Sequence, residues 1–253
     1  MFNKKPEIKF VNLQPELINK PAQQPKPYKE FLPEWWRQIP TRHNDVLTIR
    51  RCPGITDFFS NMYVIPMWTD LGIQFDKDVN HLRLRHKESD TFPIWEMHDP
   101  KQLIDHTNIF IGDRPVETVV KIVSPWNIIT PKGYSVLQIP LFYNFEPNYT
   151  LLPGIFDTDI YHEINVPFLL HSNNKEIEFN EGQPLLAFIP FKRTKYNQKN
   201  INKNNKKDIE YLMEQANKLQ DYSFGKKPNA YRKMQQERDS GTIDKKDRFE
   251  EML

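Results

Sequence analysis

The sequence predicts a mainly β protein, and three features support this class. Its 253 residues include 21 prolines but only 8 glycines, and strand ends and turns tolerate prolines far better than long helices do. Short apolar runs alternate with turn residues between residues 41 and 193, as they do in strands joined by turns. That range also has no long helical repeat of apolar residues.

Seven apolar runs within residues 41–193 are predicted to be strands. In the run at residues 163–170, the even-numbered residues are all apolar and share one face of the predicted strand. Residues 56–62 and 99–106 are predicted to be short helices. The predicted strands are VLTIRR (46–51), MYVIPMW (62–68), HLRLRH (81–86), TVVKIV (118–123), GYSVLQIPLFY (133–143), EINVPFLL (163–170) and LLAFIPF (185–191).

Pro167 and Pro190 fall inside the last two of these runs. Proline has no backbone N–H to donate to a neighbouring strand, so it is confined to edges, ends and bulges of sheets. We therefore expect both strands to be edge strands or to carry bulges.

The two ends of the chain differ from its centre. Residues 1–40 are predicted to form an extended arm, because a proline every few residues excludes a continuous helix. Trp35 and Trp36 would anchor this arm, and docking on its own domain is favoured over docking on a partner chain. Residues 194–253 are predicted to be a polar linker followed by a helical tail. The helix is expected at residues 208–222, with Asp208 near its start and apolar residues at Ile209, Leu212, Met213, Ala216 and Leu219.

Charge is nearly balanced over the whole chain, with 35 Lys and Arg against 33 Asp and Glu. A polyanion binder is therefore not the default class, and nucleic acid is not an expected partner. Residues 192–253 hold 16 basic and 10 acidic residues, whereas the remainder holds 19 and 23. A solvated linker explains this asymmetry as well as an anionic partner does.

The sequence also limits location and metal binding. It has no apolar run of membrane-spanning length, and its first residues lack the apolar region of a secretory signal. The single cysteine, Cys52, forms no internal disulfide and excludes a multi-cysteine zinc site. The histidines lack metal-ligand spacing, so no metal site is predicted. We expect a cytoplasmic protein, or a virion protein assembled in the host cytoplasm.

Residues 153–192 carry the most informative motif. They resemble the third and fourth motifs of the dUTPase family, which read G-[VI]-I-D-[ST]-D-Y-x-G-E-I-x-V and, after a polar turn, F-x-I-x-x-G-D-R-I-A-Q-L-I. The resemblance implies a β-clip, dUTPase-like distorted barrel, and trimers whose sites borrow segments from several chains. The matching residues are Gly154, Ile155, Asp157, Thr158, Asp159, Glu163, Ile164, Val166, Phe179, Gly182, Leu185, Ala187 and Ile189.

Looser matches precede this motif. Gly54 and Asp57 resemble the first family motif, A-G-x-D-L, with spacing that differs by a residue. Pro131, Gly133 and Tyr134 resemble the strand before the second motif. If these matches hold, residues 77–120 are an insertion. The segment from Ser124 to Ser135 also resembles an uncharacterised bacterial and phage domain family with the pattern PW-x-I-x-TP-x-GYS, which has no known activity.

The phosphate-binding parts of the dUTPase pattern are missing. The second motif, P-R-S-G-L-A, is replaced by IPLFYN, and the arm that closes over the phosphates is reduced to Phe224-Gly225. The tyrosine that packs under deoxyribose aligns with Ile160, and Tyr161 is one residue off, which on a strand is the opposite face. A triphosphate needs several cations and backbone amides, which this sequence does not visibly supply.

Two interpretations of the paired acids follow. By resemblance, Asp157 is the general base of a water attack, its basicity raised by Asp159, with Asp57, Tyr134 and Asp159 binding substrate and Mg²⁺ on the phosphates. Alternatively, both acids form the turn itself and accept from backbone amides. The missing phosphate clamp favours the second interpretation.

The sequence therefore favours a non-catalytic structural or assembly protein on a dUTPase-like scaffold, such as a phage virion component, without a cofactor. It is expected to be a homo-oligomer, or to bind other particle proteins through residues 1–40 and 208–253. The alternative is a Mg²⁺-dependent deoxynucleoside triphosphate pyrophosphatase or a nucleotide-binding regulator.

Overall fold

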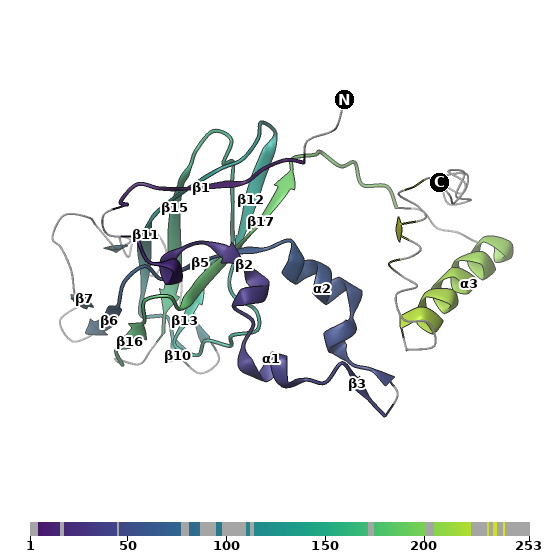
Figure 1. Cartoon of the computed structure of the whole chain (residues 1–253), viewed down its shortest axis with the longest axis horizontal. Helices are drawn as coiled ribbons and strands as arrows, with labels where there is room; N and C mark the ends of the chain where they lie inside the picture. Colours follow the sequence, from purple (N-terminus) through teal and green to yellow (C-terminus); the bar gives the residue numbers. More distant parts are fainter. Residues whose placement is uncertain are drawn as a thin grey trace. The chain divides into compact units, whose positions relative to one another are not determined.

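The structure is a computed structural model of the chain. It describes residues 5–15, 18–44, 46–76, 81–86, 95–97, 110–111, 114–171, 175–200, 205–223, 232, 235–236 and 240. The chain divides into two compact units (Figure 1). Unit 1 comprises Met1–Pro33 and Ser60–Arg193, and unit 2 comprises Glu34–Phe59 and Thr194–Leu253.

Unit 1 is built from antiparallel sheets, which confirms the mainly β class. We call the two five-stranded sheets sheet A and sheet B; within the described residues they do not close into a barrel. Sheet A has the order β1 (Lys9–Asn12), β11 (Thr118–Ile129), β15 (Glu163–Leu170), β13 (Tyr149–Leu151), with β8 (Trp95–Met97) also paired to β11. Sheet B has the order β14 (Gly154–Phe156), β12 (Tyr134–Ile139), β17 (Pro184–Lys192), β5 (Tyr63–Pro66), β2 (Lys26–Pro27).

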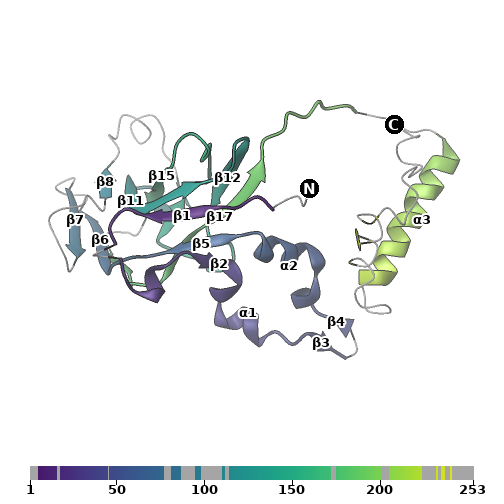
Figure 2. The ribbon, with the colours of Figure 1, turned by 45° about the horizontal axis from the view of Figure 1, so that its top comes forward.

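Smaller elements complete unit 1. A three-stranded sheet has the order β16 (Ile177–Phe179), β6 (Leu71–Asp76), β7 (His81–His86), and β9 (Phe110–Ile111) pairs with β10 (Arg114–Pro115). The 3₁₀ turns η1 (Pro21–Gln23) and η2 (Tyr28–Glu30) lie in the N-terminal segment. That segment also supplies β1, which lies beside β11 (Figure 2).

Unit 2 contains the helices and one hairpin. Its elements are α1 (Glu34–Gln38), β3 (Arg42–His43), β4 (Val46–Leu47), the 3₁₀ turn η3 (Ile49–Arg51), α2 (Pro53–Ser60, its last residue assigned to unit 1) and α3 (Lys206–Ser223). Helix α3 covers the predicted helix at residues 208–222, with Asp208 in its first turn. None of the described helices is both long and apolar enough to cross a membrane.

Most predicted strands are confirmed, two of them at their exact bounds, β7 and β15. The prediction for residues 46–51 is wrong: only Val46–Leu47 form a strand, and Ile49–Arg51 form a 3₁₀ turn. The apolar residues there do not alternate over enough length to form a sheet face. The predicted helix at residues 56–62 is present in part as α2. The predicted helix at residues 99–106 lies outside the described residues.

The strands that contain Pro167 and Pro190 are not edge strands. Both β15 and β17 are internal, although each takes part in an irregular pairing. The carbonyl of Pro167 accepts from the Leu152 N–H (3.0 Å), so its nitrogen faces the end of β13, whose pairing stops at Leu151. Pro190 lies beyond Phe188, where the pairing of β17 with β5 stops. Each proline therefore lies where one neighbouring strand has ended and no N–H is required.

The core of unit 1 lies between the sheets. The even-numbered residues of β15 are buried, as their alternation predicts. Phe168 is fully buried and packs against Tyr149 (ring centroids 5.5 Å apart) and Phe179 (6.1 Å). These rings join sheet A to the three-stranded sheet.

We predict that Phe168→Ala lowers the free energy of unfolding by about 3–5 kcal/mol, because it leaves a cavity between well-packed rings. Urea unfolding followed by circular dichroism measures this. Ile155→Ala is the matched control: Ile155 is exposed on β14, so its change should stay within about 0.5 kcal/mol. Equal effects of the two variants would contradict the assigned core.

Candidate functional site

Residues 157–162 form the turn that carries both predicted acids. The turn leaves sheet B at the end of β14 and enters sheet A at the start of β15. The carbonyl of Asp157 accepts from the backbone N–H groups of Ile160 (2.8 Å) and Tyr161 (2.9 Å), which closes the turn. Gly154 to Val166 is thus a sharp corner between two β segments, as the motif predicts.

A second turn crosses between the same two sheets. Residues 130–133 join the end of β11 in sheet A to the start of β12 in sheet B. The Tyr134 N–H donates to the Pro131 carbonyl (3.0 Å), and Gly133 has a φ of +83°, a conformation that favours glycine. Because β11 neighbours β15 and β12 neighbours β14, the two crossing turns are adjacent.

Two buried threonines bind the crossing turns together. The hydroxyls of Thr130 and Thr158 are 2.8 Å apart, and the Thr130 N–H donates to the Thr158 carbonyl (3.2 Å). The Thr130 hydroxyl also donates to the Tyr134 carbonyl. His162 donates from Nδ1 to the Thr158 carbonyl (2.9 Å), so this histidine has a local structural role.

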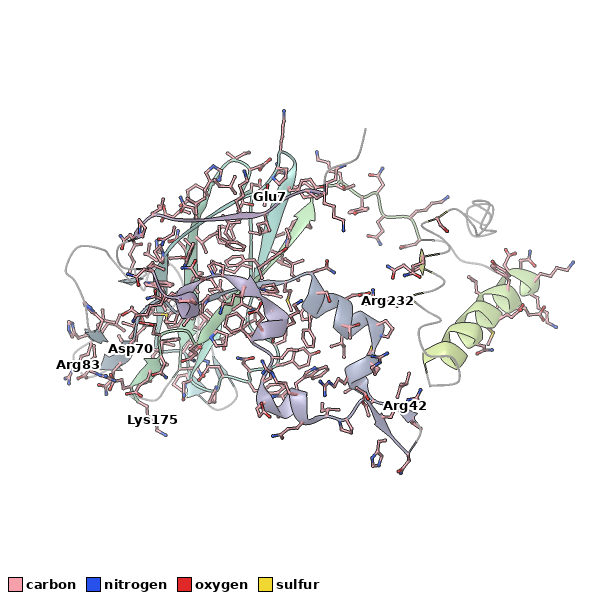
Figure 3. All side chains as sticks on the ribbon, in the orientation of Figure 1. Glu7, Arg42, Asp70, Arg83, Lys175 and Arg232 are labelled. Atoms are coloured by element: carbon pink, nitrogen blue, oxygen red, sulfur yellow. The ribbon has the colours of Figure 1, made fainter. Side chains whose placement is uncertain are left out.

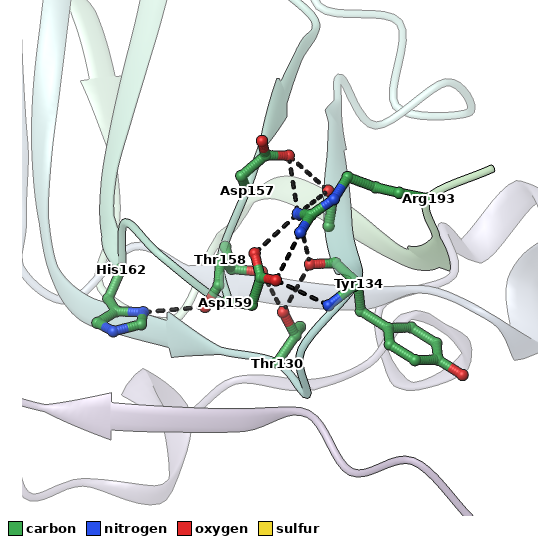
Figure 4. Close-up of polar contacts among 9 residues, drawn as sticks. Thr130, Tyr134, Asp157, Thr158, Asp159, His162 and Arg193 are labelled. Atoms are coloured by element: carbon green, nitrogen blue, oxygen red, sulfur yellow. Dashed lines mark hydrogen bonds and ion pairs between the residues drawn. The ribbon is translucent and has the colours of Figure 1, made fainter. Parts of the chain in front are cut away.

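Arg193, the residue directly after β17, completes the site (Figure 4). Its guanidinium binds the Asp159 carboxylate with two bonds: Nη1 to Oδ1 (2.7 Å) and Nη2 to Oδ2 (2.5 Å). The Gly133 N–H donates to the same carboxylate (2.8 Å). The backbone of Arg193 joins the arrangement too, because its N–H donates to the Gly133 carbonyl (2.8 Å).

The two acids lie in different surroundings. The Asp159 side chain is 6% exposed and the Asp157 side chain 51% exposed. Asp157 Oδ1 accepts from the Ser135 hydroxyl (2.6 Å) and lies 3.1 Å from Arg193 Nη1. Arg193 Nη1 also donates to Ser135 Oγ and to the Tyr134 carbonyl. One guanidinium therefore serves both carboxylates, the serine hydroxyl and a backbone carbonyl.

The pKa of Asp159 is lowered from its ordinary value of 3.8 to about 2, chiefly by the hydrogen bonds from Arg193 and then by the Gly133 N–H. The carboxylates in turn raise the pKa of the Arg193 guanidinium, with Asp159 the largest cause. Asp159 is therefore ionised at neutral pH and is a poor proton acceptor.

The structure brings three of the four predicted site residues together. Asp157 and Asp159 share Arg193, and Tyr134 joins them through its backbone carbonyl, while its ring extends away from the cluster (Figure 4). Asp57 lies in unit 2, on α2, where Arg232 forms an ion pair with it and also reaches the Thr56 hydroxyl.

Sequence reasoning missed Arg193 and Ser135. Arg193 is separated by 34 residues from Asp159, so no local spacing links them. The sequence held one signal: Arg193 is a cation at the end of the predicted strand that becomes β17. That strand pairs with β12, which begins directly after a crossing turn. Ser135 lies within the GYS pattern and faces Asp157 across sheet B.

The arrangement chiefly provides structural chemistry. Two carboxylates and one guanidinium leave the three side chains with a formal charge of −1, which repels a triphosphate. In the described part of the chain, no three His, Cys, Asp or Glu side chains gather closely enough to hold a metal ion. Asp157 keeps an exposed carboxylate, so this group has access to solvent as a base.

No protein-family model matches the chain, and no curated protein matches it in sequence. Among solved structures, the chain is similar to a mutant dUTPase from phage phi11 of S. aureus, with a TM-score of 0.36 and 9% sequence identity. This match covers 78% of the present chain and 98% of that chain. A similarity at this level does not indicate a function. The function is therefore inferred from the geometry of the site.

We predict that Arg193→Gln destabilises the protein at neutral pH, because Asp159 is then a nearly buried carboxylate without its cation. The folded-state pKa of Asp159 lies below its unfolded value, so the stability it contributes is present above about pH 4 and is lost as the pH falls toward 2. Urea midpoints of wild type and variant should therefore converge between pH 5 and pH 2.

Lys192→Gln is the control for this experiment, because it removes the same charge from an exposed neighbour. Its urea midpoint should stay close to that of wild type at every pH. A gap between wild type and Arg193→Gln that is equally wide at pH 5 and pH 2 would rule out the assigned role of Asp159.

Proposed function

We propose that the chain is a non-catalytic structural or assembly protein, such as a component of a phage particle. One observation carries this proposal: Arg193, the cation of the candidate site, is bound to Asp159 and Asp157 rather than directed to an open anion site. The two acids serve to join crossing turns, which is the structural alternative that the sequence favours.

Charge supports the same conclusion. Hydrolysis of a nucleoside triphosphate needs cations that offset the phosphates in the transition state. At this site the cation is already matched by two carboxylates, and releasing it would leave Asp159 nearly buried and ionised without its partner. Binding a triphosphate at Arg193 would therefore act against the fold.

The surface around the corner fits contact with another protein. Ile160 and Tyr161 are large apolar residues that are exposed in the turn at residues 157–162. Exposed apolar groups of this kind are typical of interaction surfaces. We propose that the chain forms homo-oligomers or binds other particle proteins, with residues 1–40 and 208–253 as further docking segments. The family resemblance suggests a trimer.

The alternative function is a Mg²⁺-dependent deoxynucleoside triphosphate pyrophosphatase, or a regulator that binds nucleotide without turnover. The half-exposed Asp157 favours it, because this carboxylate is open to solvent as a general base would be. In that case Mg²⁺ would be held mainly by the phosphates of the substrate.

We predict no pyrophosphate release when the purified protein is incubated with dUTP or dCTP and Mg²⁺, and no nucleotide-induced rise in melting temperature. A ligand that binds only the folded state raises that temperature, so the thermal measurement also tests the regulator. Asp157→Asn is the paired variant. Turnover that this substitution abolishes would establish the enzyme, and a thermal shift without turnover would establish the regulator.

We predict that the full-length chain has the mass of an oligomer in light scattering, with a trimer as the expected species. A chain that ends at Lys207 lacks the docking segment 208–253. At equal concentration its mass should correspond to fewer subunits than that of the full-length chain. A monomeric full-length chain at high protein concentration would contradict the proposed self-association.

A further inference from the structure

Residues 37–51 of unit 2, which we call the arginine loop, concentrate positive charge. The sequence has four arginines here, Arg37, Arg42, Arg50 and Arg51, with one acid, Asp45, and no lysine. The loop thus carries a formal charge of +3, whereas the whole chain carries +2. A near-neutral total therefore conceals a basic region.

Hydrogen bonds close the arginine loop at its base. Arg50 donates from Nη1 to the carbonyls of Arg37 (2.7 Å) and Ile39 (2.9 Å), at the end of α1. The Thr48 N–H donates to the Thr41 carbonyl (3.2 Å). Strands β3 and β4 pair between these contacts, so this part of the chain is a hairpin that is closed at its base (Figure 1).

Three of the four arginines in the arginine loop are exposed, namely Arg37, Arg42 and Arg51. Arg42 lies in β3, close to the tip of the hairpin (Figure 3). Arg50 is less exposed, because its guanidinium holds the loop closed. The acid of α2 does not add negative charge here, since Asp57 is paired with Arg232.

An exposed tryptophan precedes the loop. On α1, Trp36 is buried and packs edge-on against Phe59, with ring centroids 5.2 Å apart. Its neighbour Trp35 is 42% exposed. Burial of Trp36 against Phe59 therefore fixes the short helix and leaves a large flat ring at the surface beside a basic loop.

We propose that the arginine loop and Trp35 form a binding surface for single-stranded nucleic acid. Guanidinium groups bind phosphate oxygens with two parallel hydrogen bonds and stack on bases, and an exposed indole stacks on an unpaired base. This inference goes beyond the proposed function and does not depend on it.

The choice of arginine distinguishes this surface from a general basic patch. Lysine binds an anionic lipid surface as well as arginine does. Lysine is also more than twice as frequent as arginine in this chain. The loop nevertheless uses arginine alone. Planar recognition of phosphate and base explains that selection, and the exposed indole favours single strands over duplex.

The test is fluorescence anisotropy of the full-length protein with a labelled single strand of about twenty nucleotides, long enough for several contacts. The double variant Arg42→Gln, Arg51→Gln should raise Kd at least about tenfold. It should also reduce the magnitude of the slope of log Kd against log salt concentration by about 1.4, because two phosphate contacts are lost. Trp35→Leu should raise Kd with an unchanged salt slope. Arg50 is retained, since it holds the loop.

Two matched variants separate this surface from general electrostatics. Lys206→Gln with Lys207→Gln removes the same charge from exposed positions on α3 and should leave Kd within about twofold. Arg42→Lys with Arg51→Lys keeps the charge but loses the planar contacts, and should bind more weakly than wild type. Circular dichroism of each variant confirms folding.

The following outcomes would overturn the proposal: no binding at low salt, equal affinity for duplex, wild-type affinity of the lysine variant, or an equal loss in the α3 control. Binding of an acidic peptide or an anionic vesicle in place of the oligonucleotide would assign the loop to that partner instead.

Discussion

The ion pair between Arg193 and Asp159 lies where two crossings between sheets A and B meet. Strands β11 and β15 are neighbours in one sheet and β12 and β14 in the other, so the chain must turn twice at the same corner. Turns of this kind leave backbone N–H and C=O groups without ladder partners. Thr130, Thr158 and the Asp159 carboxylate provide those partners, and Arg193 neutralises the carboxylate.

This requirement changes how the paired acids are interpreted. A carboxylate that accepts from a guanidinium and a backbone amide is stabilised as an anion, so its pKa falls. A general base near neutral pH needs the opposite shift. Asp159 therefore stabilises the fold and is unsuited to proton transfer. Asp157 is hydrogen-bonded at one oxygen only and is exposed, so it can still contact solvent or a ligand. The same short motif thus holds one structural acid and one accessible acid.

Local patterns in the sequence predict most of this fold and only part of the site. The strand at residues 163–170 is evident because its even-numbered residues are all apolar and alternate with less apolar ones from Glu163 to Phe168. Residues 46–51 have too short a pattern, and local hydrogen bonds determine their turn. The corner at Asp157 and Asp159 is predictable from its own residues. The partner of these acids is not, because Arg193 reaches them only through the pairing of β17 with β12.

The division of charge follows the division into units. Unit 2 has 18 basic and 13 acidic residues, whereas unit 1 has 17 and 20. In unit 1 the site cation is matched by carboxylates that fold the corner. In unit 2 only Arg50 of the loop arginines is half-buried, with its guanidinium on backbone carbonyls, while the others reach solvent. If the chain binds an anion, we expect contact through unit 2, because three arginines of the loop are exposed there, whereas releasing Arg193 of unit 1 would leave Asp159 nearly buried without its cation.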